Sequence, residues 1–175
     1  MKNTIKFFGI IAVAAVIGFS FIACGEKADG GPDSALNGTW ANSDGKMVLN
    51  NGNISFFEKD DEVVVEFVRG TYSTSGNNIT VTFTQVSGAI MGNMASAVGL
   101  SPSQFYTQQQ VKNAVITYLT GNGSPQVDAE AFFEKQFGEL FSELLRTHKG
   151  TYSVSGNKLT LTMEGEKPEV LTKQP

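Results

Sequence analysis

The sequence predicts a mainly β fold: an up-and-down antiparallel β-barrel of about eight strands, with an α-helical segment inserted at about residues 88–149. Gly-Thr-Tyr-Ser recurs at residues 70–73 and 150–153, and each copy leads through Ser-Gly-Asn into a run of alternating apolar and polar residues. Alternation with a period of two is typical of a strand with one buried face. Between the two copies, the apolar spacing changes to that of amphipathic helices.

The N-terminus has the features of an export signal. Lys2 and Lys6 precede a run of apolar or small residues at 7–23, and Ala23 stands immediately before Cys24. A basic start, an apolar stretch and a small residue at the cut describe a secretory signal. The junction resembles the lipobox of bacterial lipoproteins. That resemblance implies a diacylglyceryl thioether on Cys24, cleavage before it and acylation of the freed amine.

Two other interpretations of this segment stay open. Phe21 stands where the lipobox usually has Leu, so an ordinary signal that leaves Cys24 as a free thiol is one alternative. The other is an uncleaved anchor, although the apolar run falls slightly short of the ~20 residues of a spanning helix. The lipobox resemblance implies a lipid-anchored protein of the cell envelope. We expect it in the outer membrane, with the periplasmic or surface face left open.

The rest of the chain has the size of one domain. Without residues 1–23, the 175-residue chain keeps 152 residues, and the loss of Lys2 and Lys6 gives a net charge of −6. An acidic domain is a poor partner for nucleic acid. Cys24 is the only cysteine, so no disulfide is expected. Within residues 24–35, the lipobox resemblance implies a lipidated Cys24, and the Gly- and Asp-rich residues after it predict a flexible tether. Residues 36–175 form the expected barrel domain.

The first half of the barrel is expected to contain four strands, at residues 38–42, 46–50, 53–58 and 62–73. Asn51-Gly52 is the strongest short signal for a hairpin turn. The charged residues 59–61 predict the next turn. These connections are short, which favours strands that follow one another around a barrel.

The strand at 62–73 carries a predicted irregularity. Val63, Val65 and Phe67 are expected on one face, with Glu66 on the other. Gly70 interrupts this alternation and predicts a bulge or bend.

Four more strands follow from the two repeated hairpins and the C-terminus. The inward faces of the strands after the two Ser-Gly-Asn turns are expected to carry Ile79, Val81, Phe83, Leu159, Leu161 and Met163. Pro168 opens a last short strand that runs to Thr172. Eight strands would suffice to close a barrel and remove its exposed edges.

The insert is expected to be all helical. Thr107 and Gln110 predict a capping box at the start of one helix. After a Gly-rich turn, a second helix should run from near Asp128 to near Thr147, with Gly150 as its stop. Its apolar stripe consists of Phe133, Phe137, Leu140, Phe141, Leu144 and Leu145. This stripe should either pack on the outer barrel wall or cover an open end as a lid. A third, short helix is expected within 89–98.

The start of the barrel resembles a known family. Gly38-Thr39-Trp40 on the first strand, followed by a meander of about eight strands, resembles the lipocalins and the wider calycin group. The repeated hairpins are similar to bacterial lipocalin-like lipoproteins. The resemblance covers residues 36–86 and 150–175. It implies that Trp40 packs across the closed end of the barrel beneath a basic residue, for which Lys158 and Lys173 are the candidates.

The resemblance implies a small apolar or amphipathic ligand, held by a membrane-anchored barrel. The alternative is a structural or interaction lipoprotein whose barrel is filled by its own side chains, because barrels of about eight strands can be solid or hold one small ligand. Candidate residues, as core or as ligand lining, are Trp40, Phe67, Tyr72, Phe83, Tyr152, Phe133, Phe137 and Phe141.

Catalytic chemistry is not expected. His148 is the only histidine, and its predicted place at a helix C-terminus makes it a favourable cap. The acidic residues at 58–62 do not have the spacing of a calcium loop. No phosphate-binding loop, dinucleotide fingerprint or nucleophile elbow occurs. The sequence therefore predicts a protein that is not an enzyme and has neither metal nor cofactor.

Overall fold

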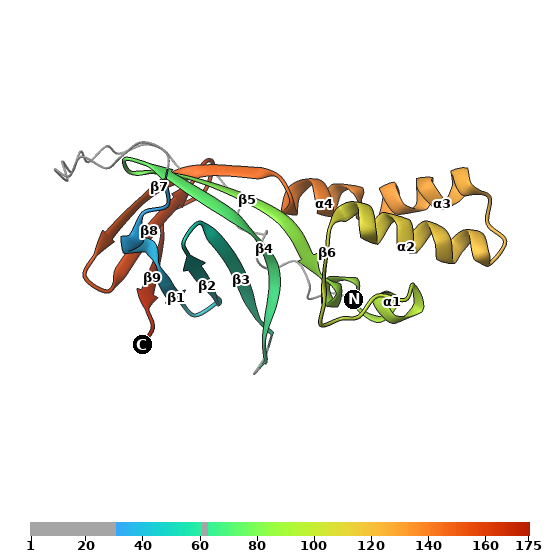
Figure 1. The fold of residues 1–175 in the computed structure, drawn as a ribbon, viewed down its shortest axis with the longest axis horizontal. Coiled ribbons are helices and arrows are strands. Elements are labelled where there is room, and N and C mark those ends of the chain that lie inside the picture. Colours follow the sequence, from blue (N-terminus) through green and yellow to red (C-terminus); the bar gives the residue numbers. More distant parts are fainter. Residues whose placement is uncertain (1–30, 61–62) are drawn as a thin grey trace.

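The computed structural model describes residues 31–60 and 63–175 and contains a closed antiparallel barrel of eight strands (Figure 1). Each strand pairs with the next along the chain, and the last pairs with the first. The predicted fold class is thus confirmed. The predicted signal and Cys24 lie outside the described residues. The barrel strands are β1 (Gly38–Ala41), β2 (Gly45–Asn50), β3 (Asn53–Asp60), β4 (Val63–Ser75), β5 (Asn78–Ser87), β7 (Thr147–Ser155), β8 (Lys158–Met163) and β9 (Glu169–Lys173).

A close strand contact requires the glycine that begins each repeated segment. A β-carbon at Gly70 would collide with the carbonyl oxygen of Thr82 across the β4–β5 pair. One at Gly150 would collide with the carbonyl oxygen of Thr162 across the β7–β8 pair. Only glycine fits where another backbone approaches this closely. The same residue is therefore required at the same place in both copies.

Two β-bulges shape the long strand β4. The register of β4 with β5 shifts beside Gly70, as predicted, and its register with β3 shifts between Phe56 and Phe57. The second bulge was not predicted, and it places Val68 and not Phe67 directly opposite Phe56. Val68 is buried, with 3% of its surface exposed, whereas its neighbour Phe67 is only partly buried. An extra residue in one strand moves every later side chain to the other face.

One end of the barrel, here called the closed end, is filled with side chains. A 3₁₀ turn, η1 (Ser34–Leu36), lies there, and its Leu36 carbonyl accepts a 2.6 Å hydrogen bond from Trp40 Nε1. Trp40 is 0% exposed, and Lys173 Nζ lies 5.1 Å from the centroid of its ring. Of the two basic candidates, Lys173 therefore covers the tryptophan, whereas Lys158 is exposed.

Both repeated tyrosines reach the chain that precedes β1. Tyr72 donates its hydroxyl to Asn37 Oδ1 at 3.2 Å, and Tyr152 donates to Asp33 Oδ2 at 2.8 Å. Thr74 Oγ1 donates to the carbonyl of Gly31 at 2.7 Å. The part of the expected tether from Gly31 onwards is thus attached to the closed end.

The insert between β5 and β7 is helical apart from one short strand, β6 (Phe105–Tyr106), which was not predicted and which pairs with the end of β5. The helix α2 (Gln108–Gly121) has the expected capping box between Thr107 and Gln110. The elements are η2 (Gly88–Met91), α1 (Asn93–Ala97), α2 (Gln108–Gly121), α3 (Gln126–Phe133), a π-helical turn η3 (Glu134–Gly138) and α4 (Glu139–Leu144).

The end of the second helix was predicted wrongly. α4 stops at Leu144, and Gly150 does not terminate a helix because it lies inside β7. His148 is consequently a strand residue and not a helix cap. The reason is long-range: from Thr147 onwards, the backbone pairs with β5, and this pairing replaces helical hydrogen bonds.

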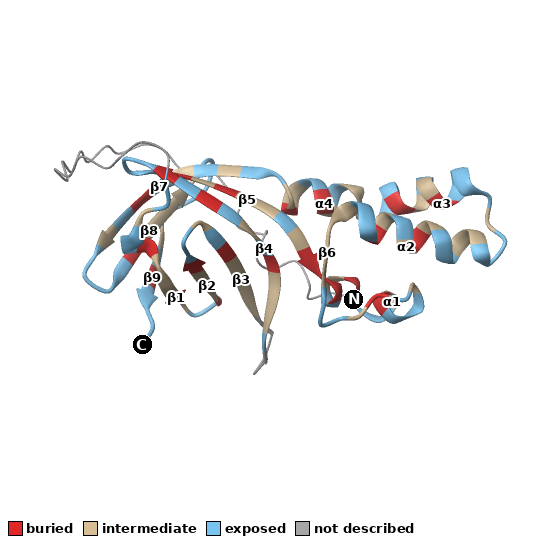
Figure 2. Cartoon of the chain, in the orientation of Figure 1, coloured by how far each residue is buried: buried red, intermediate tan, exposed pale blue. Residues whose placement is uncertain are grey.

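The insert packs on the inner side of the barrel strands. Val68 and Val86 lie opposite each other in the β4–β5 pair. They share the inward face of Phe56, which is the partner of Val68 on β3. Both valines belong to the apolar cluster that includes the insert. The insert contributes Met91, Ala95, Leu100, Val111, Val115, Phe133, Phe141 and Leu144 to this cluster. Figure 2 shows the buried residues continuing from β4 and β5 into the insert. The outer wall is therefore not where the apolar stripe is buried.

Candidate functional site

The end of the barrel opposite η1, here called the open end, has inward-facing apolar side chains that are only partly buried. The strand register places Phe56, Phe83, Leu161 and Met163 on the inward face. These four side chains are only partly buried, although they pack against the core that includes the fully buried Leu159. The barrel is thus solid at the closed end and has an apolar, partly exposed inner wall at the open end.

A carboxyl group stands on this inner wall. Glu169 is opposed to Leu161 in the β8–β9 pair and therefore shares its inward face. Asn42 Nδ2 donates a hydrogen bond to Glu169 Oε1. Burial raises the pKa of Glu169, and the nearby negative charges of Asp44 and Glu166 raise it further. The open end therefore holds a carboxylate that is poorly stabilised as an anion.

A histidine is the second polar group of the inner wall. His148 is opposed to Val81 in the β5–β7 pair, and its ring meets that of Phe83 edge-on with centroids 5.8 Å apart. Its Nε2 is buried and has no hydrogen-bond partner within the described residues. Burial, followed by the charge of Arg146, lowers the pKa of His148.

A groove of about 530 Å³ interrupts the barrel wall where the insert leaves it. The pairing of β5 with β7 ends at Thr82 and its pairing with β6 begins at Val86, so residues 83–85 have no described strand partner on that edge. The groove is lined by Thr82, Phe83, Thr84, Thr107, Gln108, Gln109, Lys112 and Leu145. Phe83 is the residue that this groove shares with the inner wall of the open end.

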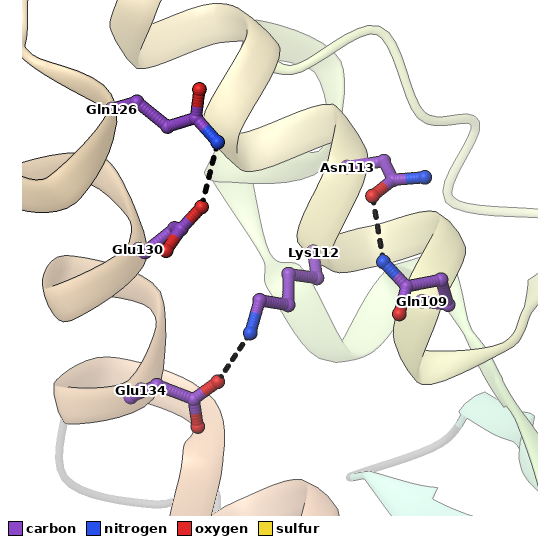
Figure 3. Close-up of polar contacts among 6 residues, drawn as sticks. All are labelled: Gln109, Lys112, Asn113, Gln126, Glu130 and Glu134. Atoms are coloured by element: carbon purple, nitrogen blue, oxygen red, sulfur yellow. Dashed lines mark hydrogen bonds and ion pairs between the residues drawn. The ribbon is translucent and has the colours of Figure 1, made fainter.

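Polar contacts fix the helices beside the groove (Figure 3). Lys112 Nζ on α2 lies 2.7 Å from Glu134 Oε1 on η3, and this hydrogen bond raises the pKa of Lys112. Gln126 donates to Glu130 at 2.8 Å within α3. Lys112 lines the groove, but its charge is already paired. This ion pair joins α2 to η3.

The sequence-predicted candidates lie in three places. Trp40, Tyr72 and Tyr152 are core residues of the closed end. Phe133 and Phe141 are fully buried in the insert, with ring centroids 5.9 Å apart, and Phe137 packs beside them. Phe67 is partly buried against the same cluster. Of these candidates, Phe83 is the one at the open end.

Sequence reasoning missed several residues of the open end. Leu161 and Met163 were assigned to an inward face, but nothing local shows that this part of the face is left uncovered. Asn42 and Phe56 were not considered. Glu169 carried a usable signal, because it is a charged residue two positions before Leu171, on the apolar side of a period-two pattern.

No protein-family model and no curated protein matches the chain. The chain is similar to the crystal structure of an uncharacterized protein from Bacteroides eggerthii, with a TM-score of 0.42 and 12% sequence identity over 79% of this chain and 99% of that chain. Within residues 31–60 and 63–175, there is no group of three or more His, Cys, Asp or Glu side chains arranged to hold a metal ion. None of the helices described there is long and apolar enough to cross a membrane.

Proposed function

We propose that this protein is a lipid-anchored, lipocalin-like binding protein that holds a small apolar or amphipathic ligand at the open end of its barrel. The observation that supports this function is the contrast between the two ends. Inward-facing side chains are fully buried near Trp40, whereas Phe56, Phe83, Leu161 and Met163 remain partly exposed. An apolar wall with a few polar groups on it is the usual composition of a small-molecule site.

The physical driving force would be burial of this wall. Each Å² of apolar surface removed from water contributes about 25 cal/mol. A ligand that covers the four partly exposed apolar side chains would therefore gain affinity from their burial. The insert extends the wall, because its apolar cluster continues from Phe56 and Phe83. The helices of the insert would then cover the bound ligand from one side, as part of a lid.

Attachment at the closed end supports an orientation on the membrane. Asp33 and Gly31 are bonded to the barrel at that end. If Cys24 carries the lipid, the seven residue steps from Cys24 to Gly31 can span at most about 25 Å. The closed end would therefore lie near the bilayer, and the open end would face away from it, within the cell envelope.

The proposed site is tested by filling it. Leu161→Trp should occupy the open end, whereas Thr160→Trp places the same side chain on the outer face of the same strand. Native mass spectrometry of the full chain, released from detergent after incubation with decanol, should show bound decanol in the wild type and in Thr160→Trp. Leu161→Trp should have lost it. Equal binding by all three proteins would contradict the proposed site.

The alternative function, an interaction lipoprotein with no ligand, is favoured by a different observation. Val127 at the start of α3 is 70% exposed, and Tyr118 near the end of α2 is 42% exposed. Both are large apolar side chains at the tip of the insert, distant from the barrel. Absence of any bound amphiphile, together with a partner whose binding is lost in Val127→Asp, would favour this function over the first.

A further inference from the structure

We propose that the ligand of the open end is a cationic amphiphile, an alkyl chain with an ammonium head group that Glu169 binds. The inference depends on the ligand-binding function proposed above and names the chemical class of the ligand. It is based on which polar atoms the inner wall presents and on which charges surround them.

The unsatisfied polar atoms of the inner wall are hydrogen-bond acceptors. The carboxylate of Glu169 accepts one described hydrogen bond, from Asn42, although a carboxylate has about four acceptor positions. His148 Nε2 has no described hydrogen-bond partner, and this nitrogen can serve as an acceptor in the neutral ring. A head group that complements these atoms must donate. An ammonium group has three donors and no acceptor, whereas a carboxylate has only acceptors.

The charges around Glu169 have the same sign. Asp44 and Glu166 both lie close enough to disfavour the ionised form of Glu169, and Glu166 also acts on His148. An entering cation would relieve this repulsion, whereas an anion would increase it. A fatty acid is therefore the wrong ligand for this end of the barrel.

Three basic side chains of the described residues have other partners. Arg146 lies 3.3 Å from Glu143 in an ion pair. Lys173 covers the ring of Trp40 at the closed end, and Lys46 lies 4.4 Å from the ring centroid of Phe57, whose side chain is on the outer face. None of these described contacts places a cation on Glu169. Its carboxylate thus remains available to a ligand.

The test compares three head groups on one alkyl chain. The full chain is held in phosphatidylcholine nanodiscs and dialysed to equilibrium against decylamine, decanol or decanoic acid, with empty nanodiscs as background. Decylamine should bind about tenfold more tightly than decanol, since a charge-assisted hydrogen bond is about twice as strong as a neutral one. Decanoic acid should bind most weakly.

Variants then assign the preference to one residue. Glu169→Gln should bind decylamine and decanol equally, because it removes the charge and keeps the shape. Glu164→Gln removes an equal charge from an exposed position next to Met163 and should keep the preference for the amine. If decanol or decanoic acid binds as tightly as decylamine, the inference is wrong, although the open end still binds ligands. If none of the three binds, the ligand-binding function fails and the inference with it.

Discussion

The hydroxyl of Tyr152 donates a 2.8 Å hydrogen bond to the carboxylate of Asp33, which is 119 residues earlier in the chain. This contact joins the C-terminal hairpin to the segment that enters the barrel from the N-terminus. Tyr72 in the first copy of the repeat makes the corresponding contact with Asn37. The repeated Gly-Thr-Tyr-Ser segments therefore fasten the start of the chain to the closed end.

Removing the hydroxyl of Tyr152 should weaken this attachment. We expect Tyr152→Phe to lower the free energy of unfolding by about 1.5–3 kcal/mol, the typical value for a hydrogen bond to a charged group. Urea unfolding, followed by the fluorescence of the single tryptophan, measures it. Tyr118→Phe, at an exposed position, is the control and should change stability by less than about 0.5 kcal/mol. Equal effects would mean that the Asp33 contact does not stabilise the fold.

Lys173 should contribute to stability through the ring that it covers. Lys173→Met keeps most of the apolar stem but removes the ammonium group from Trp40, which should cost about 0.5–2 kcal/mol. Lys158→Met, on the exposed side of the adjacent strand, should be nearly neutral. The same urea titration distinguishes the two variants. A larger loss from Lys158→Met would contradict the pairing of Lys173 with the tryptophan.

Glu169 should destabilise the folded protein at neutral pH. Because its pKa is raised in the folded state, the folded protein holds this proton more tightly, and stability falls as the pH rises through the window above 4.5. Glu169→Gln should therefore raise the midpoint of thermal unfolding at neutral pH by about 2–4 °C. Below pH 4.5 the difference should disappear, which calorimetry at two pH values can check. A variant that is less stable at neutral pH would show that the carboxylate has a stabilising partner.

His148 should make the protein sensitive to mild acid. Its pKa is lowered from 6.5 by burial, so the unfolded chain binds the proton more readily. Stability is then complete above pH 6.5 and is lost as the pH falls below that value towards the folded pKa. Urea midpoints measured across this window should fall with acidification in the wild type and stay flatter in His148→Phe. Parallel slopes would assign the acid sensitivity to other groups.

The barrel was predictable because its signals are local. The turns at Asn51-Gly52 and after the repeated segments need particular backbone angles, with φ of 48° at Asn51 and 87° at Gly52, and the alternating runs beside them show their buried face directly. The capping box of α2 is also local. Wherever a few neighbouring residues determine the conformation, the expected element is present.

The open end was not predictable for the opposite reason. Whether Leu161 is covered depends on which distant segments lie over that end of the barrel, and no local pattern shows this. His148 was placed on a helix because the helical pattern continues past Leu144, whereas pairing with β5 makes it a strand residue. The candidate site is therefore created by contacts between segments that are distant in the sequence.

The most direct test of the account is the position of a bound amphiphile. Methionine methyl groups report it by NMR, because Met163 is on the partly exposed wall of the open end, whereas Met91 is buried in the cluster of the insert. The full chain in nanodiscs, with labelled methionine methyls, is titrated with decanol. The account predicts a saturable shift of the Met163 resonance and intermolecular contacts between its methyl group and the alkyl chain. Bound decanol that leaves Met163 unchanged, or that contacts only the methionines of the insert, would contradict it.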